Sequence, residues 1–287
     1  MALSYVQKEL WANTILALFP EMLVSDRIAN TNVIADSRGD KWHITAASDV
    51  SVADVNDAAD LTYDDLTDTD TEVTVNFDKA MKLIDYDSNK VETSINYMPT
   101  YIRRGAERLA DALDAAVLSV HGDAGSNFDN GGTDWQFTKD TCAEIPAFFG
   151  KLSKACKDLN WPEASQKYLV VPSGFKEAIL TYSGGRESAL GDSDITRGRG
   201  DAFVYGGFNI FVSNNLTTVS TTTHGLCGIA GDGIALGKQI DPNSVEMMRA
   251  EGRFADLYRA RLRAGYKVYR ATALIDVEIN STTVATS

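Results

Sequence analysis

The chain has 287 residues, of which 44% are hydrophobic, and it carries a formal net charge of −13. This length predicts one large domain or two lobes around a sizeable core. Such an acidic chain is not expected to bind nucleic acid through its charge. The sequence has no run of about 18 apolar residues, so it predicts no membrane-spanning helix. The start of the chain lacks the basic segment and long apolar core of a signal peptide, so we expect an intracellular product.

The three cysteines are odd in number, widely spaced and never arranged as C-x-x-C. This spacing argues against both a disulfide framework and a zinc site. We therefore expect Cys142, Cys156 and Cys227 to be reduced thiols that pack as small hydrophobic side chains.

The first segment of distinct composition runs from Trp42 to Asp78, after residues 1–35, which we expect to form an extended or partly helical arm. The segment contains no lysine or arginine and ten acidic residues. Its edges, Lys41–Thr45 and Glu72–Phe77, alternate apolar and polar residues, which is typical of strands.

Three structures are compatible with this acidic segment. Like charges with little apolar surface are typical of a disordered loop, and clustered carboxylates are the ligands of calcium sites. The third structure is a two-stranded arm that lies on the basic surface of a neighbouring subunit. The strand-like edges favour the arm, and a long hairpin with so little apolar surface needs a partner to cover it.

The clearest helix is predicted for Tyr97–His121, where apolar residues recur every three or four positions. On its exposed side Arg103 is placed to pair with Glu107, and Arg108 with Asp111. Gly122 then stops the helix. The prediction is a long amphipathic rod.

The rest of the chain mixes helices and strands in an α+β order. Helices are predicted at 144–160 and from Pro172 to Tyr182, and Gly-rich loops at 122–138 and 183–200. Strands are predicted at 168–171, 203–205, 208–213, 226–229, 244–250 and 265–279.

The sequence predicts no catalytic, cofactor-binding or metal-binding residue. His43, His121 and His224 are the only histidines, and none has the spacing of a metal-ligand pair. The segment from Asp85 to Asn89 begins like a calcium loop, but it lacks the turn glycine and the final glutamate.

The segment from Arg249 to Arg270 is as basic as the earlier segment is acidic, with seven bases against two acids. It suits either a nucleic-acid surface or a contact between subunits, and the acidic segment in the same chain favours the contact. The candidate contact residues are Asp60, Asp64, Asp65, Asp68, Asp70, Arg103, Arg104, Arg253, Arg259 and Arg261.

Four segments carry a resemblance to a known family: LADALDAAVL (109–118), YLVVPSGFKEAIL (168–180), YGGFNIFVSNNL (205–216) and AGYKVYRATAL (264–274). In this order they resemble the tailed-phage major capsid proteins, which have the Hong Kong 97-type fold. The resemblance spans roughly residues 10–280.

The resemblance implies a division of the chain into five parts. These are an N-terminal arm (1–35), a peripheral-domain strand with the extended loop (36–90), the spine helix of the peripheral domain (91–139), an axial domain (140–245) and return strands of the peripheral domain (246–287).

The resemblance also implies a structural subunit, not an enzyme, that needs no cofactor. It would assemble with itself into pentamers and hexamers of an icosahedral virion capsid in the host cytoplasm, and would enclose double-stranded DNA without sequence-specific binding. A portal and possibly a cement protein are implied partners. A separate scaffolding protein is expected, because residues 1–35 are too short to serve as one.

Three alternatives remain open from the sequence. An encapsulin-like compartment shell has a similar fold and length but would carry enzymes as cargo. A metal-dependent hydrolase would use the acidic segment. A secreted adhesin would use Arg199-Gly200-Asp201, but the lack of a signal peptide disfavours it.

Overall fold

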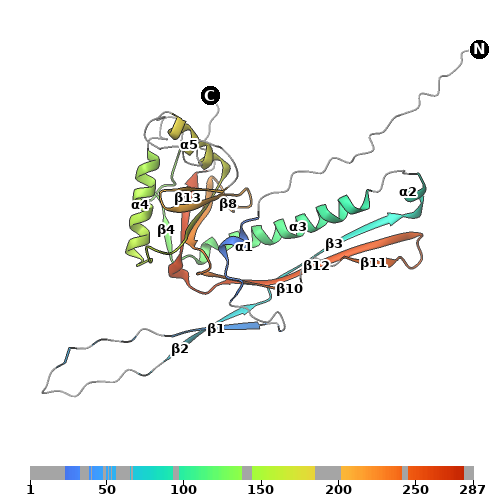
Figure 1. Cartoon of the computed structure of the whole chain (residues 1–287), viewed down its shortest axis with the longest axis horizontal. Coiled ribbons are helices and arrows are strands. Elements are labelled where there is room, and N and C mark those ends of the chain that lie inside the picture. The colour runs from blue at the N-terminus through green and yellow to red at the C-terminus, as the bar shows by residue number, and fades with distance from the viewer. Residues whose placement is uncertain are drawn as a thin grey trace, which may run out of the picture.

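The molecule has three visible parts: a compact body, an elongated rod and a projecting hairpin (Figure 1). No helix among the residues that the structure describes is both long and apolar enough to cross a bilayer. The computed structural model describes residues 23–32, 39, 41–47, 50, 52, 54–55, 65, 67–92, 97–137, 144–184, 202–240 and 245–280.

The rod consists of one long helix, α3 (Met98–Leu118), lying along a four-stranded sheet (Figure 1). Strand β12 (Ala255–Val268) is the centre of this sheet. It pairs with β3 (Phe77–Tyr86) along one edge, and with β10 (Ile234–Ile240) and β11 (Glu246–Arg249) along the other. Every pairing in this sheet is antiparallel.

The helix approaches the sheet closely because of the residues on its inner face. Leu109, Leu113 and Val117 are buried there at the helical spacing that the sequence predicts. At Gly105 a Cβ atom would lie 2.1 Å from the sulfur of Met81 on β3, so a larger residue there would require the Met81 side chain to move. A 3-10 turn, η1 (Ser119–Asp123), ends the rod at the compact body.

The compact body is built on a seven-stranded sheet in the order β4-β13-β9-β5-β7-β6, with β8 added on β9. One face is covered by α4 (Ile145–Asp158) and α5 (Ser173–Gly184). The strands are β4 (Ser126–Phe128), β5 (Lys167–Val171), β6 (Ala202–Tyr205), β7 (Phe208–Val212), β8 (Thr218–Val219), β9 (Thr222–Ile229) and β13 (Leu274–Asn280).

Strand β5 contributes to two separate cores because successive side chains point to opposite faces of a sheet. Leu169 and Val171 face α4 and α5, where Phe148 and Phe175 belong to an aromatic cluster. Tyr168 and Val170 face the other way, into the core shared with α3 and β12. Both faces of the sheet are therefore buried where β5 crosses it.

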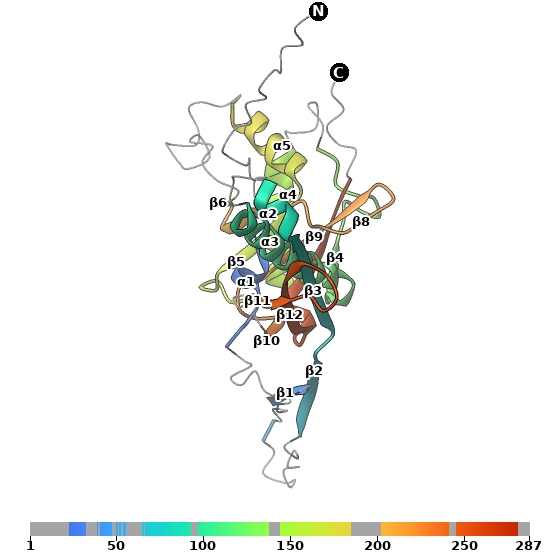
Figure 2. The same ribbon diagram turned by 90° about the vertical axis from the view of Figure 1, so that its right-hand side faces the viewer.

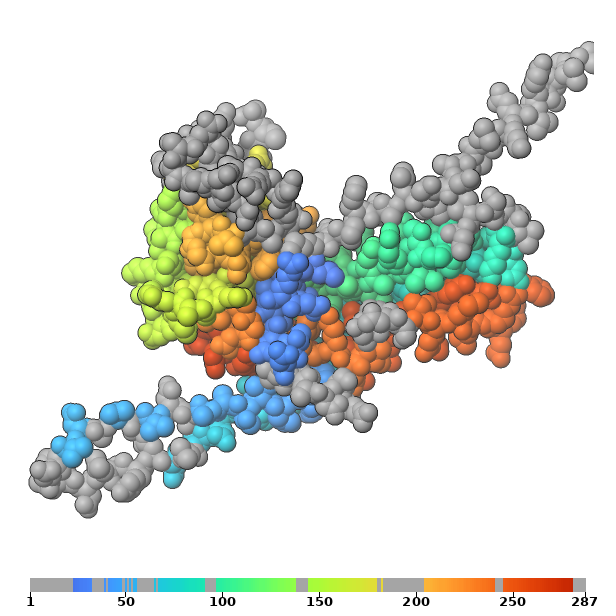
Figure 3. Space-filling model, in the orientation of Figure 1, coloured from blue at the N-terminus to red at the C-terminus, as the bar shows by residue number. Residues whose placement is uncertain are grey.

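The hairpin consists of β1 (Lys41–Ala47) and β2 (Asp68–Thr74), paired antiparallel from Lys41 opposite Thr74 to Ala47 opposite Asp68. Figures 2 and 3 show it projecting beyond the rest of the described chain. We call these two strands, with the described residues between them, the arm.

The predicted elements are largely confirmed. The helices predicted at 97–121, 144–160 and 172–182 correspond to α3, α4 and α5, and the α3 pairs form, with Arg103 3.5 Å from Glu107 and Arg108 3.3 Å from Asp111. The short helix α1 (Ser25–Ile28) lies in the segment 1–35, which was predicted to be extended or partly helical. The sequence did not predict α2 (Asp87–Glu92) or the 3-10 turn η3 (Ala271–Ala273).

Some predictions about strands are wrong. The strand predicted at 265–279 is interrupted, because η3 separates β12 from β13. The edge predicted at Glu72–Phe77 also divides, since β2 ends at Thr74 and β3 starts at Phe77. The two described cysteines, Cys156 and Cys227, are free and buried in the core of the body, whereas Cys142 lies outside the described residues.

Candidate functional site

The base of the arm is fixed to the rod. Trp42 lies over Gly265, where an added Cβ would meet its ring at 2.5 Å and the Thr74 carbonyl oxygen at 2.6 Å. Val73 is fully buried, and Lys267 Nζ donates a 3.0 Å hydrogen bond to the Glu72 carbonyl. The arm therefore leaves the rod in a defined direction.

Three valines between the two strands of the arm are left exposed by the described part of the chain. Val50, Val52 and Val55 are 65%, 98% and 76% exposed. These valines lie between β1 and β2, on a two-stranded hairpin that has little apolar surface to stabilise it alone. The arm is therefore a candidate contact surface.

The acidic candidate residues lie on this arm as far as the structure describes them. Asp65, Asp68 and Asp70 are exposed, and Asp60 and Asp64 lie outside the described residues. Asp70 already has a partner within the arm, since its Oδ2 is 2.6 Å from His43 Nδ1. Asp65 and Asp68 have no ion-pair partner among the described residues.

The basic candidate residues divide into two groups. Arg103, Arg259 and Arg261 pair within the chain, with Glu107, Glu246 and Asp78 respectively. The Arg261 guanidinium donates to Asp78 and lowers the pKa of that carboxyl. Arg104 and Arg253 have no ion-pair partner within the described part of the chain.

A cluster of ion pairs holds the far end of the rod. Arg249 Nη1 donates to Asp87 at 2.8 Å and to Asp256 at 3.0 Å, and Lys90 also contacts Asp256. Hydrogen bonds from Arg249 lower the pKa of Asp87, and those from Lys90 and then Arg249 lower the pKa of Asp256. Beside this cluster Phe254 is 82% exposed.

Replacing Arg249 with Met is expected to lower the thermal midpoint by an amount that depends on pH. A carboxyl whose folded pKa is depressed stabilises the fold above its unfolded pKa, here 3.8, and stops doing so as the pH falls through the lower folded value. The difference in thermal midpoint between wild type and variant should therefore be constant at pH values well above 3.8. It should shrink as the pH falls through the folded pKa values of Asp87 and Asp256. Calorimetric scans from about pH 7 to about pH 2 measure the gap.

Arg253→Met is the matched control, because it removes a neighbouring arginine without an ion-pair partner among the described residues. The difference in thermal midpoint between Arg253→Met and wild type should not change with pH. A gap for Arg249→Met that widened in acid would contradict the assignment of these ion pairs.

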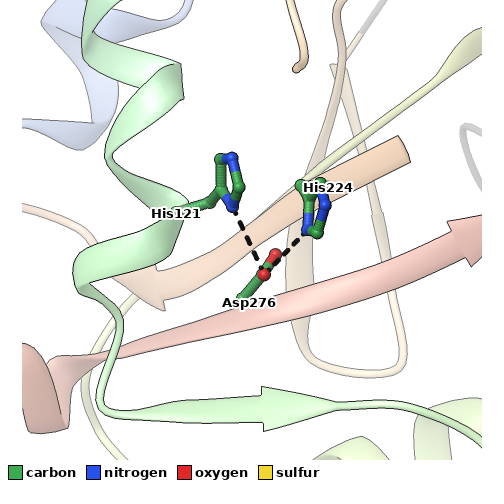
Figure 4. A group of neighbouring side chains, drawn as sticks. All are labelled: His121, His224 and Asp276. Carbon is green, nitrogen blue, oxygen red and sulfur yellow. Dashed lines mark hydrogen bonds and ion pairs between the residues drawn. The ribbon is translucent and has the colours of Figure 1, made fainter. Parts of the chain in front are cut away.

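A second cluster lies where η1 meets the sheet of the body, and the sequence did not predict it. Figure 4 shows His121 and His224 pointing toward Asp276 from three different elements, η1, β9 and β13. The Nδ1 atoms of His121 and His224 lie 3.4 Å and 2.8 Å from Asp276 Oδ2. His224 lies inside β9.

Other residues contribute negative charge beside this cluster. Glu278 lies opposite His224 in the pairing of β13 with β9 and accepts a 3.2 Å hydrogen bond from Asn127 Nδ2. Burial raises the pKa of Glu278, and the negative charges of Asp276 and Asp134 raise it further. No local sequence spacing could have revealed the cluster, because His121 and Asp276 are 155 positions apart.

No family model and no curated protein matches the sequence. Solved structures do match over nearly the whole chain. A chain from Mycobacterium phage Che8 has 23% identity and a TM-score of 0.80, covering 98% of this chain and 99% of that one.

Two further structures are similar. The capsid of Cyanophage P-SCSP1u has 15% identity and a TM-score of 0.70, with 98% and 94% of the two chains covered. The capsid of the native GTA particle has 14% identity and a TM-score of 0.65, with 96% of each chain covered. The chain therefore has the phage capsid fold.

Proposed function

We propose that this chain is a structural subunit that assembles with itself into an icosahedral capsid shell around phage double-stranded DNA. The observation that carries the proposal is the arm, which is fixed at its base and has valines that the described residues leave exposed. The phage capsid fold over nearly the full length supports the same conclusion. The similar capsid structures do not favour the encapsulin-like alternative.

The remote alternative, a metal-dependent hydrolase using the acidic segment, is not supported by the described part of the arm. Such an enzyme needs ligands that converge from several elements. Asp68 and Asp70 instead lie along one exposed strand. We therefore infer a structural role.

The geometry suits a contact between different surfaces of neighbouring copies. Contacts of this kind close into rings when the rotation between copies is right, which gives pentamers and hexamers. Burial of Val50, Val52 and Val55 on a neighbour would supply affinity, at about 25 cal/mol for each Å² of apolar surface. Exposed ion pairs add only about 0–1 kcal/mol each, so the arm's charges would mainly orient the encounter.

We propose the following roles for the candidate contact residues. Asp65 and Asp68, with Asp60, Asp64 and Asp70, guide the arm toward a neighbour. Arg104 and Arg253 are the proposed basic partners, because Arg103, Arg259 and Arg261 already have acidic partners in their own chain. Arg103, Arg259 and Arg261 would contribute only by leaving these acidic residues and pairing with acidic residues of a neighbouring copy.

We also propose the domain division and the partners that the sequence suggested. The arm belongs to the segment 36–90, α3 to 91–139 and α4 with α5 to 140–245, while 1–35 and 246–287 are the N-terminal arm and the return strands. A separate scaffolding protein, a portal and possibly a cement protein would act with the shell in the host cytoplasm. The net charge of −13 would keep the enclosed DNA from adhering to the wall.

Electron microscopy of the full chain, expressed alone and with its neighbouring genes, tests the proposal. We expect closed shells of uniform diameter in at least one preparation, containing DNA when the packaging genes are present. Shells that contain a co-purified enzyme and no DNA would support the encapsulin-like alternative. Compact single chains in every preparation would contradict a shell function.

A further inference from the structure

Asp276 is an unusual carboxylate for the interior of a structural protein. It is 3% exposed, and its Oδ1 atom has no hydrogen-bond partner among the described residues. Burying a charged oxygen without a partner is strongly unfavourable. Its other oxygen, Oδ2, is approached by both imidazoles. The site therefore has more acceptor capacity than the described chain satisfies.

The two imidazoles present their Nδ1 atoms to the same carboxylate oxygen. The rings of His121 and His224 stack with their centroids 4.1 Å apart and their planes 15° from parallel. Two imidazolium ions at that distance would repel each other, and only the neutral form has a free ring nitrogen lone pair. Two stacked imidazoles and one carboxylate thus bring three possible ligand atoms together, which suits the binding of a cation.

The spacing of the donor atoms fits a small metal ion. The ligand atoms of the three residues all lie within 4.8 Å of one another. In a tetrahedral site with bonds of about 2.0–2.1 Å, ligand atoms lie roughly 3.3 Å apart. The two distances from Nδ1 to Asp276 Oδ2, 3.4 Å and 2.8 Å, lie on either side of this value.

We propose that His121, His224 and Asp276 bind a divalent transition-metal ion of the Zn²⁺ class. Imidazole nitrogen with carboxylate oxygen favours Zn²⁺ or Co²⁺ over Ca²⁺ and Mg²⁺, which prefer ligand sets made of oxygen alone. Glu278 lies opposite His224 in the strand pairing and adds negative charge beside the three ligands. Each histidine side chain is 15% exposed, which gives an ion access from solvent.

A metal here would have a structural consequence. It would connect η1, at the end of the rod helix, to β9 and β13 in the sheet of the body. The ion would thus join the rod to the body within one chain. This proposal does not depend on assembly, so it stands or fails separately from the proposed function.

Titration of the purified full-length chain with Co²⁺, in a preparation without a histidine tag, tests the site. We expect one Co²⁺ per chain, visible absorption bands typical of four-coordinate Co²⁺ and their loss when Zn²⁺ is added. His224→Gln and Asp276→Asn should each weaken binding by at least about tenfold. The matched control is His43→Gln, which removes the exposed histidine paired with Asp70 and should leave binding unchanged.

A second measurement needs no variant. Zn²⁺ should raise the thermal midpoint of the wild-type chain, and a chelator should reverse the rise, because an ion that binds only the folded state stabilises it. Absence of the Co²⁺ bands in the wild type would overturn the site. So would bands that persist in both site variants, or bands that only His43→Gln removes.

Discussion

A subunit in which residues 48–67 are replaced by Asn-Gly is expected to fold but to form almost no closed shells. Ala47 pairs with Asp68, so a two-residue turn can join the two strands at that point without changing their register. The base of the arm, with Val73 and Trp42 on the rod, is retained. The change therefore removes the distal arm and its exposed valines while leaving the fold intact.

The expected effect is large because shell contacts act together. Each added contact becomes nearly intramolecular once its neighbours are in place, so losing one in every copy lowers the yield of shells by roughly 100-fold or more. Counts of shells by electron microscopy at equal protein concentration measure this. Circular dichroism and the thermal midpoint would show whether the subunit is still folded.

Two further variants make the comparison specific. Val50→Thr, Val52→Thr and Val55→Thr together keep the length of the arm and should reduce shell yield less than the deletion does. Val219→Thr changes an exposed valine on β8 and should have no effect. Normal shells from the shortened arm would show that the arm is not an assembly contact.

Replacing Asp114 with Ala is expected to destabilise the fold by about 4 kcal/mol. Asp114 is fully buried on α3, and its Oδ1 accepts hydrogen bonds from the backbone N–H groups of Val24 and Ser25 at 2.8 Å and 2.7 Å. Its Oδ2 accepts a 3.2 Å hydrogen bond from Asn215. Each hydrogen bond to a charged group contributes about 1.5–3 kcal/mol, and the variant removes the acceptor of the buried Val24 and Ser25 N–H groups.

Urea unfolding of both proteins measures this loss. Ala is a better helix former than Asp, so weaker helix propensity would not explain the loss. Asp158→Ala on α4, which removes an exposed partner of Lys154, is the control and should change stability by at most about 0.5 kcal/mol. A loss below about 1 kcal/mol for Asp114→Ala would mean that water replaces the carboxylate.

The sequence predicted the helices well because their signal is local. Leu109, Leu113 and Val117 mark the buried face of α3 by spacing alone. Only the end of strand β12 was predicted, because the arginines in its first part were interpreted as a basic surface cluster. Yet Ala260, Leu262 and Ala264 are buried at alternate positions, so the strand periodicity was present.

Long-range pairing explains most of what the sequence did not reveal. Arg261 pairs with Asp78, 183 positions away, on the neighbouring strand β3. From the sequence, the two residues appeared to belong to one acidic and one basic surface that would meet only between subunits. The cluster of His121, His224 and Asp276 was missed for the same reason, since no spacing along the chain shows which residues meet across a sheet and a helix end.

Because β5 places Leu169 in one core and Tyr168 in the other, the body and the rod have no hinge between them at this strand. A change in the angle between the body and the rod would move β5 relative to one of the two cores. The β5 side chains on that face would then lose their close packing. In a particle built from this chain, the curvature of the shell would therefore be set by the tilt between neighbouring copies and not by bending within each copy.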